Sequence, residues 1–208
     1  MDLQTRVVLV MHHSEWSATT NTGRFALRAL PNSEVRFRGL PEAPVQLEDL
    51  NHSGGELLFL YPAENAEVLT PELVASFKKP MTLVVPDGTW RQASKVYRRE
   101  PFLKANARPV ILPVTGQSDY LLRRSPNDIA FCTIEAIAHA MGFLEGEEVK
   151  QRLLAVFKLV NHRVLATRSP DWIESTMRWA TKAGRLPSKE WTSIAELREK
   201  FLPKGYRP

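Results

Sequence analysis

The sequence predicts an α/β protein with a mostly parallel sheet and helices on both faces of that sheet. Apolar, β-branched runs of strand length alternate with amphipathic segments of helix length over about the first 165 residues, which is typical of strand–helix–strand units. The runs are almost continuously hydrophobic, as expected for strands buried on both faces. In such sheets ligands bind beyond the carboxyl ends of the strands, so the loops that follow the strands are where we expect a site.

Five strands are expected, at residues 6–12, 34–39, 56–62, 81–86 and 108–114, with a short edge strand at 118–124. Helices are expected after a cap at Asn21 or Thr22, at 70–77 with Pro71 in its first turn, and at 90–99, 133–144, 148–165, 169–184 and 193–201. Residues 40–56 are acidic and rich in Pro and Gly, which predicts a loop. We interpret residues 1–164 as one domain and residues 165–208 as a basic helical extension packed on it.

The charge distribution indicates a polyanionic partner. The net charge is only +5, but residues 40–72 hold seven acidic side chains and no Lys or Arg, whereas residues 91–124 hold eight basic and two acidic side chains. Residues 161–208 add ten basic and five acidic side chains. A protein polarised in this way has a positive side that suits nucleic acid. The alternative is that these residues simply solvate helix faces.

Several classes of protein are disfavoured. The single cysteine, Cys132, supports neither a disulfide framework nor a four-cysteine zinc site. The first apolar run is short and contains Arg6, so it resembles a strand more than a signal peptide, and no run approaches the roughly 18 apolar residues of a membrane span. We therefore expect a cytoplasmic protein without a membrane partner. The phosphate-binding patterns GxxxxGK[ST] and GxGxxG are absent, which argues against a nucleotide-triphosphate enzyme.

His12, His13 and Glu15 are the residues that could suggest a metal site. Their spacing fits no common zinc pattern, and a strand would project His12 and His13 to opposite faces. No metal is expected.

The segment Asp87-Gly88-Thr89-Trp90 follows the fourth apolar run and opens a helix. Asp-Gly is an ordinary turn signal, and Thr89 with Gln92 forms a capping-box pattern. These structural roles leave Trp90 unexplained, since its indole could pack in the core or form the wall of a ligand pocket. In the helix that follows, Arg91, Lys95 and Arg98 share one face, which suits a phosphate backbone or, more plainly, solvent.

Two further polar patterns lie elsewhere in the chain. Glu135 and His139 are four residues apart on a helix that Thr133 could cap, and we interpret them as a surface pair rather than an acid–base pair. Asn21, Thr22, Gly23 and Arg24 form a polar run at a loop–helix junction, where backbone amides and Arg24 could hold an anion.

Three blocks together resemble the DTW-domain family. Residues 87–90 are similar to its Asp-x-Thr-Trp signature, and "TIEA" at 133–136 is similar to its Ser/Thr-Thr-Ile/Leu-Glu-Ala block. "MHHSEWSATTNTGR" at 11–24 resembles its amino-terminal block, which commonly reads His-Pro-x-Glu and then Asn-Thr-Gly. His13 stands in place of the usual Pro and Cys132 in place of a Ser or Thr. The cysteines that many bacterial members carry before the first strand have no counterpart here, and residues 165–208 are a candidate to replace that module in RNA binding.

The resemblance implies a SPOUT-like fold with a trefoil knot and a tRNA-uridine aminocarboxypropyltransferase activity. S-adenosylmethionine would donate its 3-amino-3-carboxypropyl group to N3 of a uridine in tRNA, and 5′-methylthioadenosine would leave. Ribosomal RNA, which distant relatives modify, is the alternative substrate. The alternative functions are a SPOUT-type RNA methyltransferase and a noncatalytic RNA-binding protein. The oligomeric state is not predicted.

The resemblance also implies roles for individual residues. Asp87 would accept the N3 proton or bind the ammonium group of the donor, and Trp90 would shape the pocket for the transferred arm. Thr89, Leu112, Thr133 and Glu135 are the other expected donor-binding residues. The expected RNA-binding residues are Asn21, Thr22, Arg24, Arg91, Lys95, Arg98, Arg123 and Arg124; the first three are alternatively candidates for the ribose of the donor.

Overall fold

The sheet contains six strands, and every strand pair in it is parallel. The computed structural model describes residues 3–51, 54–113, 118–122, 131–182 and 199–200. The strand order is β2-β1-β5-β3-β6-β4. The strands are β1 (Thr5–His12), β2 (Ser33–Arg38), β3 (Glu56–Leu60), β4 (Glu67–Val68), β5 (Met81–Asp87) and β6 (Arg108–Ile111). The predicted α/β class with a parallel sheet is confirmed.

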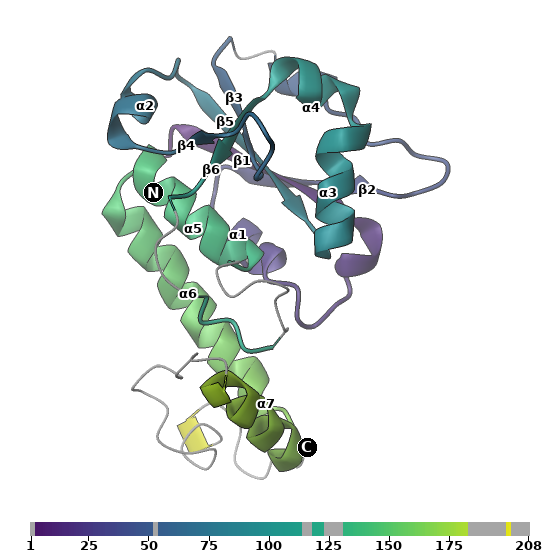
Figure 1. Ribbon diagram of the computed structural model, residues 1–208, viewed down its shortest axis with the longest axis vertical. Helices are drawn as coiled ribbons and strands as arrows, with labels where there is room; N and C mark the ends of the chain where they lie inside the picture. The colour runs from purple at the N-terminus through teal and green to yellow at the C-terminus, as the bar shows by residue number, and fades with distance from the viewer. Residues whose placement is uncertain (1–2, 52–53, 114–117, 123–130, 183–198, 201–208) are drawn as a thin grey trace.

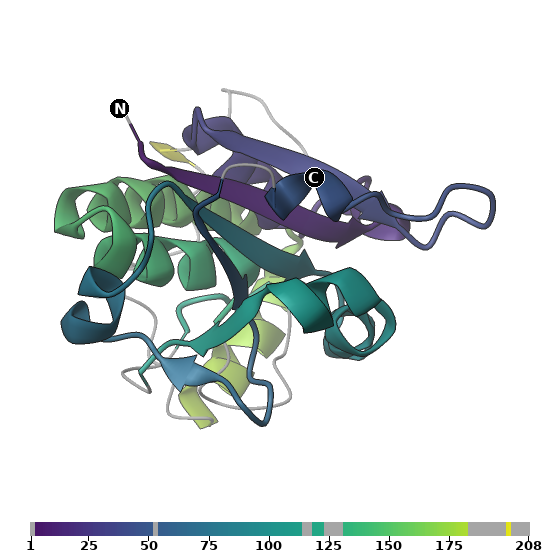
Figure 2. The ribbon, with the colours of Figure 1, turned by 90° about the horizontal axis from the view of Figure 1, so that it is seen from above.

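Helices cover both faces of the sheet (Figure 1). They are α1 (Gly23–Ala29), α2 (Pro71–Ala75), α3 (Trp90–Arg99), α4 (Pro101–Asn106), α5 (Thr133–Leu144), α6 (Glu147–Ala166) and α7 (Pro170–Lys182), with the short 3₁₀ helices η1 (His13–Glu15) and η2 (Glu48–Asn51). In both Figure 1 and Figure 2 the strands separate α3 and α4 from α5 and α6.

The alternation of side chains along β1 explains the two layers. Leu9 and Met11 belong to a core shared with α1, α5 and α6, whereas Val8 and Val10 belong to a second core shared with α3, α4 and η2. Successive side chains of a strand point to opposite faces, so one apolar run supplies both cores. We refer to these faces as the α5 face and the α3 face.

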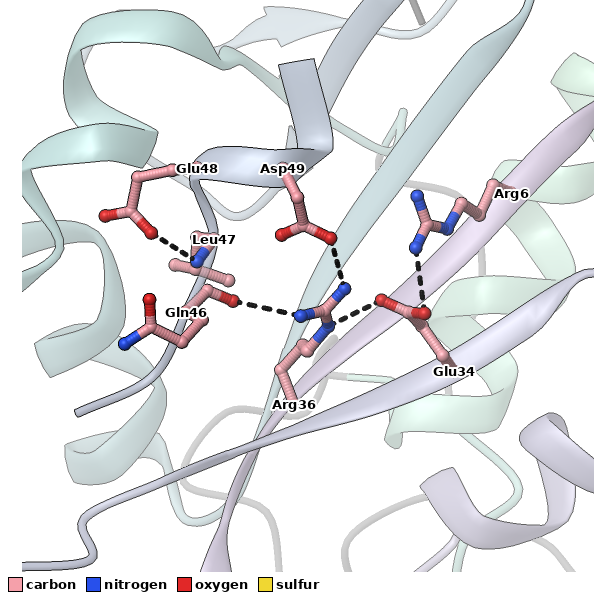
Figure 3. Close-up of polar contacts among 7 residues, drawn as sticks. All are labelled: Arg6, Glu34, Arg36, Gln46, Leu47, Glu48 and Asp49. Atoms are coloured by element: carbon pink, nitrogen blue, oxygen red, sulfur yellow. Dashed lines mark hydrogen bonds and ion pairs between the residues drawn. The ribbon is translucent and has the colours of Figure 1, made fainter. Parts of the chain in front are cut away.

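An ion-pair network fixes the outer edge of the α3 face (Figure 3). The Arg36 guanidinium contacts Glu34 Oε1 and Asp49 Oδ2, each at 2.6 Å, and Arg6 contacts Glu34 Oε2 at 2.8 Å. The side chains come from β1, β2 and η2, so the network holds the segment before β3 against the edge strand β2.

Some predicted elements differ from the observed ones. Residues 118–122 form no strand, because Ser118, Asp119 and Tyr120 direct their polar groups to side chains and loops rather than to a neighbouring strand. The short elements α4 and β4 were not predicted, and η2 lies within the predicted loop at 40–56. Of the last predicted helix, only residues 199 and 200 lie in the described part of the chain, and both are helical. The implied knot stays a prediction.

In the part of the chain that the structure describes, no helix is both long and apolar enough to cross a membrane.

Candidate functional site

Asp87 is the centre of the candidate site. It is the last residue of β5, in the middle of the sheet, and its side chain is only 3% exposed. Asn21 Nδ2 donates a hydrogen bond to Asp87 Oδ2 at 2.6 Å, and the Thr133 hydroxyl donates one to Oδ1. A buried carboxylate is costly unless such donors surround it. These bonds join residues that are 66 and 46 positions apart in sequence.

The Asn-Thr-Gly block before α1 is built around this carboxylate. While its amide nitrogen binds Asp87, Asn21 accepts a hydrogen bond from the Arg24 amide at 3.0 Å through Oδ1 and so satisfies a backbone amide in the first turn of α1. A Cβ atom on Gly23 would lie 3.0 Å from Asp87 Oδ2, so a larger residue there would crowd the carboxylate. Thr22 Oγ1 accepts from the Ile134 amide at 3.4 Å, which ties this loop to α5.

The start of α5 corrects two predictions. Cys132, not Thr133, is the amino-terminal cap, and the Thr133 hydroxyl is therefore available to bind Asp87. Glu135 does not form a surface pair with His139: Glu135 is 4% exposed, and the His139 ring instead stacks on Phe131 at 4.6 Å. The periodicity of α5 did not reveal this burial, because another loop covers the polar face of its first turn.

Glu135 holds the loop at residues 118–120. Its Oε2 accepts from the Ser118 hydroxyl at 2.6 Å and from the Cys132 amide at 2.9 Å, and Oε1 accepts from the Asp119 amide at 2.9 Å. Burial raises the pKa of the Glu135 carboxyl above its ordinary value, although the hydrogen bonds from Ser118 and Cys132 act to lower it. The carboxyl is thus a buried anchor of this loop.

The same loop is fastened to two other elements. Asn161 of α6 donates to the Asp119 carbonyl at 3.1 Å, and the Tyr120 hydroxyl donates to the Thr20 carbonyl beside Asn21. Ser118, Asp119, Tyr120 and Asn161 were not predicted to belong to the site. The polar run from Gly116 to Asp119 is a turn signal that could have indicated a loop here instead of an edge strand.

The turn after Asp87 sets the direction of α3. Gly88 has φ 153°, and a Cβ atom there would lie 2.9 Å from Gln92 Oε1. The predicted capping box is present, since Thr89 Oγ1 accepts from the Gln92 amide at 3.3 Å and Gln92 Oε1 accepts from the Thr89 amide at 2.7 Å. Thr89 thus has a structural role in starting α3. The Trp90 indole is 44% exposed, so it lies at the surface of the site and not in the core.

The sequence matches a known protein family over most of its length. The model of the DTW-domain family matches residues 1–165. This chain belongs to the DTW-domain family.

The relatives found support that assignment. A Drosophila melanogaster protein named tRNA-uridine aminocarboxypropyltransferase 2 is 37% identical over 100 residues, which is 48% of this chain and 39% of the relative. Proteins of the same name from Macaca fascicularis and Mus musculus are 25% and 26% identical over 158 residues, or 74% of this chain and 52% of each relative. The chain thus spans about half or less of the length of these relatives.

One solved structure was also found. "Structure of the SAM-dependent rRNA:acp-transferase Tsr3 from Vulcanisaeta distributa" overlaps 94% of this chain and 88% of that chain, with a TM-score of 0.47 and 14% identity. We draw no conclusion about fold or function from a likeness at this level.

The three DTW-family blocks therefore meet at one carboxylate. Asn21 comes from the first block, Asp87 from the second and Thr133 from the third. Leu112, which follows β6, is half-buried and packs against the core of the α5 face.

The basic residues of α3 that were predicted to bind RNA lie at the surface of this helix. Arg91 and Arg98 are exposed and Lys95 is half-buried. The positive charges of Arg91 and Arg99 lower the pKa of Lys95, which shows how closely the cations of this helix are spaced. Arg38, at the end of β2, joins them through an ion pair with Glu100 at 2.6 Å.

The remaining predicted RNA-binding residues have different surroundings. Asn21 and Thr22 are buried and bonded within the site, and the Arg24 guanidinium donates to the Ala18 carbonyl at 3.2 Å. Arg24 Nε is buried and has no hydrogen-bond partner among the described residues. Arg123 and Arg124 lie outside the described residues.

His12 and His13 are not on opposite faces as predicted. Strand β1 ends at His12 and η1 begins at His13, so the chain turns and the two rings stack at 4.8 Å. Burial lowers the pKa of His12, and the positive charges of Arg38 and Lys95 act in the same direction. Among the described residues, no group of three or more His, Cys, Asp or Glu side chains is arranged to hold a metal ion.

Proposed function

We propose that this protein transfers the 3-amino-3-carboxypropyl group of S-adenosylmethionine to N3 of a uridine in tRNA. The observation that carries the proposal is the convergence of the three DTW-family blocks on Asp87. The name that the three relatives share, tRNA-uridine aminocarboxypropyltransferase 2, supports the reaction and the substrate.

The reaction is a displacement at a carbon bound to sulfur. Uridine N3 gives up its proton to solvent, and its lone pair attacks the γ-carbon of the donor. The new bond is N3–Cγ, and the electrons of the broken carbon–sulfur bond go to sulfur, so that 5′-methylthioadenosine leaves. The sulfonium is a good leaving group, and correct alignment of the two reactants is therefore where most of the rate should arise.

The surroundings of Asp87 favour binding of the donor's ammonium group over acceptance of the N3 proton. Donors already approach each of its oxygens, and hydrogen bonds to a carboxylate stabilise its charged form. Each carboxylate oxygen has more than one acceptor position, so Asp87 can also accept from the ammonium group of the donor. Asp87 then holds the aminocarboxypropyl arm as a fixed negative charge, and Asn21 and Thr133 position that charge.

The other residues complete the donor site. Trp90 is exposed and begins α3 three residues after Asp87, and it would form the wall that turns the γ-carbon, rather than the methyl group, toward the uridine. Leu112 would contribute an apolar surface for the adenosine. Glu135 acts through the loop at 118–120 and is a positioning residue in this proposal. Arg24, whose buried Nε has no hydrogen-bond partner within the described part of the chain, is suited to bind an acceptor atom of the donor or the RNA.

Analysis of the small-molecule product tests this proposal. The purified protein is incubated with S-adenosylmethionine and bulk tRNA, and the released nucleoside is identified by mass spectrometry. We expect 5′-methylthioadenosine. S-adenosylhomocysteine would instead indicate a methyltransferase, and no product together with no donor binding would indicate a noncatalytic RNA-binding protein.

A further inference from the structure

Trp16 is an exposed aromatic side chain that is nevertheless held in place. Its indole is 44% exposed. Its backbone amide donates to the His13 carbonyl at 3.2 Å, and its ring packs against Phe37 of β2 with 5.3 Å between centroids and an interplanar angle of 90°. In a perpendicular contact, one ring presents its edge to the other, so Phe37 covers at most one face of the indole. An ordered indole with an open face is what base stacking requires.

The strand register places Trp16 and Asp87 on the same side of the sheet. Met11 pairs with Phe37 of β2 on one side and with Asp87 of β5 on the other, so these three residues form one row across three strands. Met11 belongs to the core of the α5 face, and Phe37 packs against that core. Two strand spacings correspond to about 10 Å between the backbones at Phe37 and Asp87. Neighbouring or next-neighbouring nucleotides of a strand with splayed bases can span this separation.

Positive charge accompanies this row at the carboxyl edge. Arg38 ends β2 one residue after Phe37. Arg38 Nη2 also donates to the Lys95 carbonyl of α3 at 3.4 Å, which links this edge to the basic face of α3. An RNA backbone that follows α3 therefore reaches the carboxyl edge where Trp16 and Asp87 lie.

We propose that Trp16 stacks on a base of the substrate RNA next to the target uridine, and that the protein therefore acts on an unpaired segment of RNA. This inference rests on the proposed function, because it names the structural class of its RNA substrate. A base within a duplex is already stacked on both sides and cannot also cover Trp16, whereas loops expose bases that stack on aromatic side chains. Single-strand sites commonly combine such aromatic rings with a basic groove.

Binding measurements on the full chain test the inference without any turnover. A fluorescently labelled single-stranded oligouridylate is titrated by anisotropy against the unaltered protein and against Trp16→Ala, Trp16→Phe and Leu159→Ala. Leu159 is a matched control, because it is an exposed apolar residue of α6, 54% exposed. We expect Trp16→Ala to lower the affinity about tenfold, as for loss of one stacked base, while Trp16→Phe retains most of it and Leu159→Ala all of it.

The salt dependence separates stacking from charge. Trp16→Ala should lower the affinity equally at all salt concentrations, because the indole neutralises no phosphate. The oligouridylate annealed to its complement should bind more weakly than the single strand, and its affinity should not respond to Trp16→Ala. Equal affinity of Trp16→Ala and the unaltered protein for the single strand would overturn the inference, as would a duplex that binds as tightly as the single strand. Melting temperatures show that the variants are folded.

The outcome is independent of the test of the proposed function. If methylthioadenosine forms but Trp16→Ala binds normally, the inference fails and the proposed function stands. If single-strand binding depends on Trp16 but no methylthioadenosine forms, the proposed function fails while the stacking surface stands.

Discussion

We expect turnover to depend on the negative charge of Asp87 and on the two hydrogen-bond donors that position it. Asp87→Asn removes the negative charge that holds the ammonium group of the donor, so the arm is no longer aligned, and we expect turnover to fall by about 100-fold. Thr133→Val removes one donor and leaves the charge, and because a hydrogen bond to a charged group contributes about 1.5–3 kcal/mol, we expect a loss of about tenfold or more. Initial rates of methylthioadenosine release measure both effects.

Thr167→Val is the control for these substitutions, because the Thr167 hydroxyl makes a local bond to the Val164 carbonyl at the end of α6. It should leave the rate unchanged. Full activity of Asp87→Asn would show that the carboxylate has no role in the reaction.

The sequence indicates which residues matter here more readily than it indicates their contacts. Asp87 and Trp90 stand out as an unusual turn, and the resemblance adds Thr133. That the Thr133 hydroxyl binds Asp87 rather than capping α5 depends on how α5 packs against β5, which the local pattern of α5 does not contain. In the same way, Asn21 was expected to bind the donor or the RNA, yet its amide is bonded to Asp87.

Helix α3 is the element on which RNA binding is expected to depend. Replacing both Arg91 and Lys95 by Glu should weaken binding of bulk tRNA and reduce the slope of log K against log salt by roughly 0.7–0.9 for each phosphate that the protein no longer neutralises. The control is Arg152→Glu on α6, since Arg152 is an exposed arginine whose partner is Glu148. Filter binding at several salt concentrations measures the slope, and an unchanged slope would place the RNA elsewhere.

The network at the edge strand β2 gives a pH-dependent contribution to stability. Burial acts to raise the pKa of Glu34, but hydrogen bonds from Arg6 and Arg36 outweigh it and hold the pKa below its ordinary value of 4.5. A lowered pKa in the folded state means that the stabilisation is present above about pH 4.5 and is lost as the pH falls through the folded-state pKa.

Urea unfolding of Glu34→Gln measures this contribution. At pH 7 the variant should be less stable than the unaltered protein by up to about 1 kcal/mol, and the difference should shrink below about pH 4. Glu174→Gln, at an exposed pair with Arg178 on α7, should show little difference at either pH. A difference for Glu34→Gln that does not change with pH would contradict the account.

The long strands and helices could be predicted from their hydrophobic patterns, whereas the short ones could not. The strands β1, β3 and β5 are continuous apolar runs, and the amphipathic pattern of α6 extends along the whole 20-residue helix, so each has a strong periodic signal. The strand β4 has two residues and α4 has six, which is too short for a hydrophobic period to appear. Residues 118–122 contain apolar positions that suit a strand, but Glu135 and Asn161 bind their backbone.

At the scale of the whole molecule, helix α7 packs on the domain that the family model covers. The match ends at residue 165, near the predicted boundary at 164, yet α7 lies beside the end of α6 (Figure 1) and Ala180 is part of the same core as Leu9. Ile173 of α7 is only 1% exposed. Ile173→Ala should therefore destabilise the protein by about 2–5 kcal/mol.

Thermal or urea unfolding followed by circular dichroism tests this expectation. The exposed Leu159→Ala should cost much less than Ile173→Ala. Two separate unfolding transitions, with only the smaller one shifted by Ile173→Ala, would show that α7 unfolds independently and would support a separable extension.

The central claim is that the aminocarboxypropyl arm, and not the methyl group, reaches a uridine. The most direct measurement uses two samples of S-adenosylmethionine, one labelled in the arm and one in the methyl group, with tRNA from a strain that lacks this modification. After digestion to nucleosides, we predict the arm label on uridine and the methyl label in methylthioadenosine in equal amounts. The methyl label on the RNA, with none from the arm, would contradict the account.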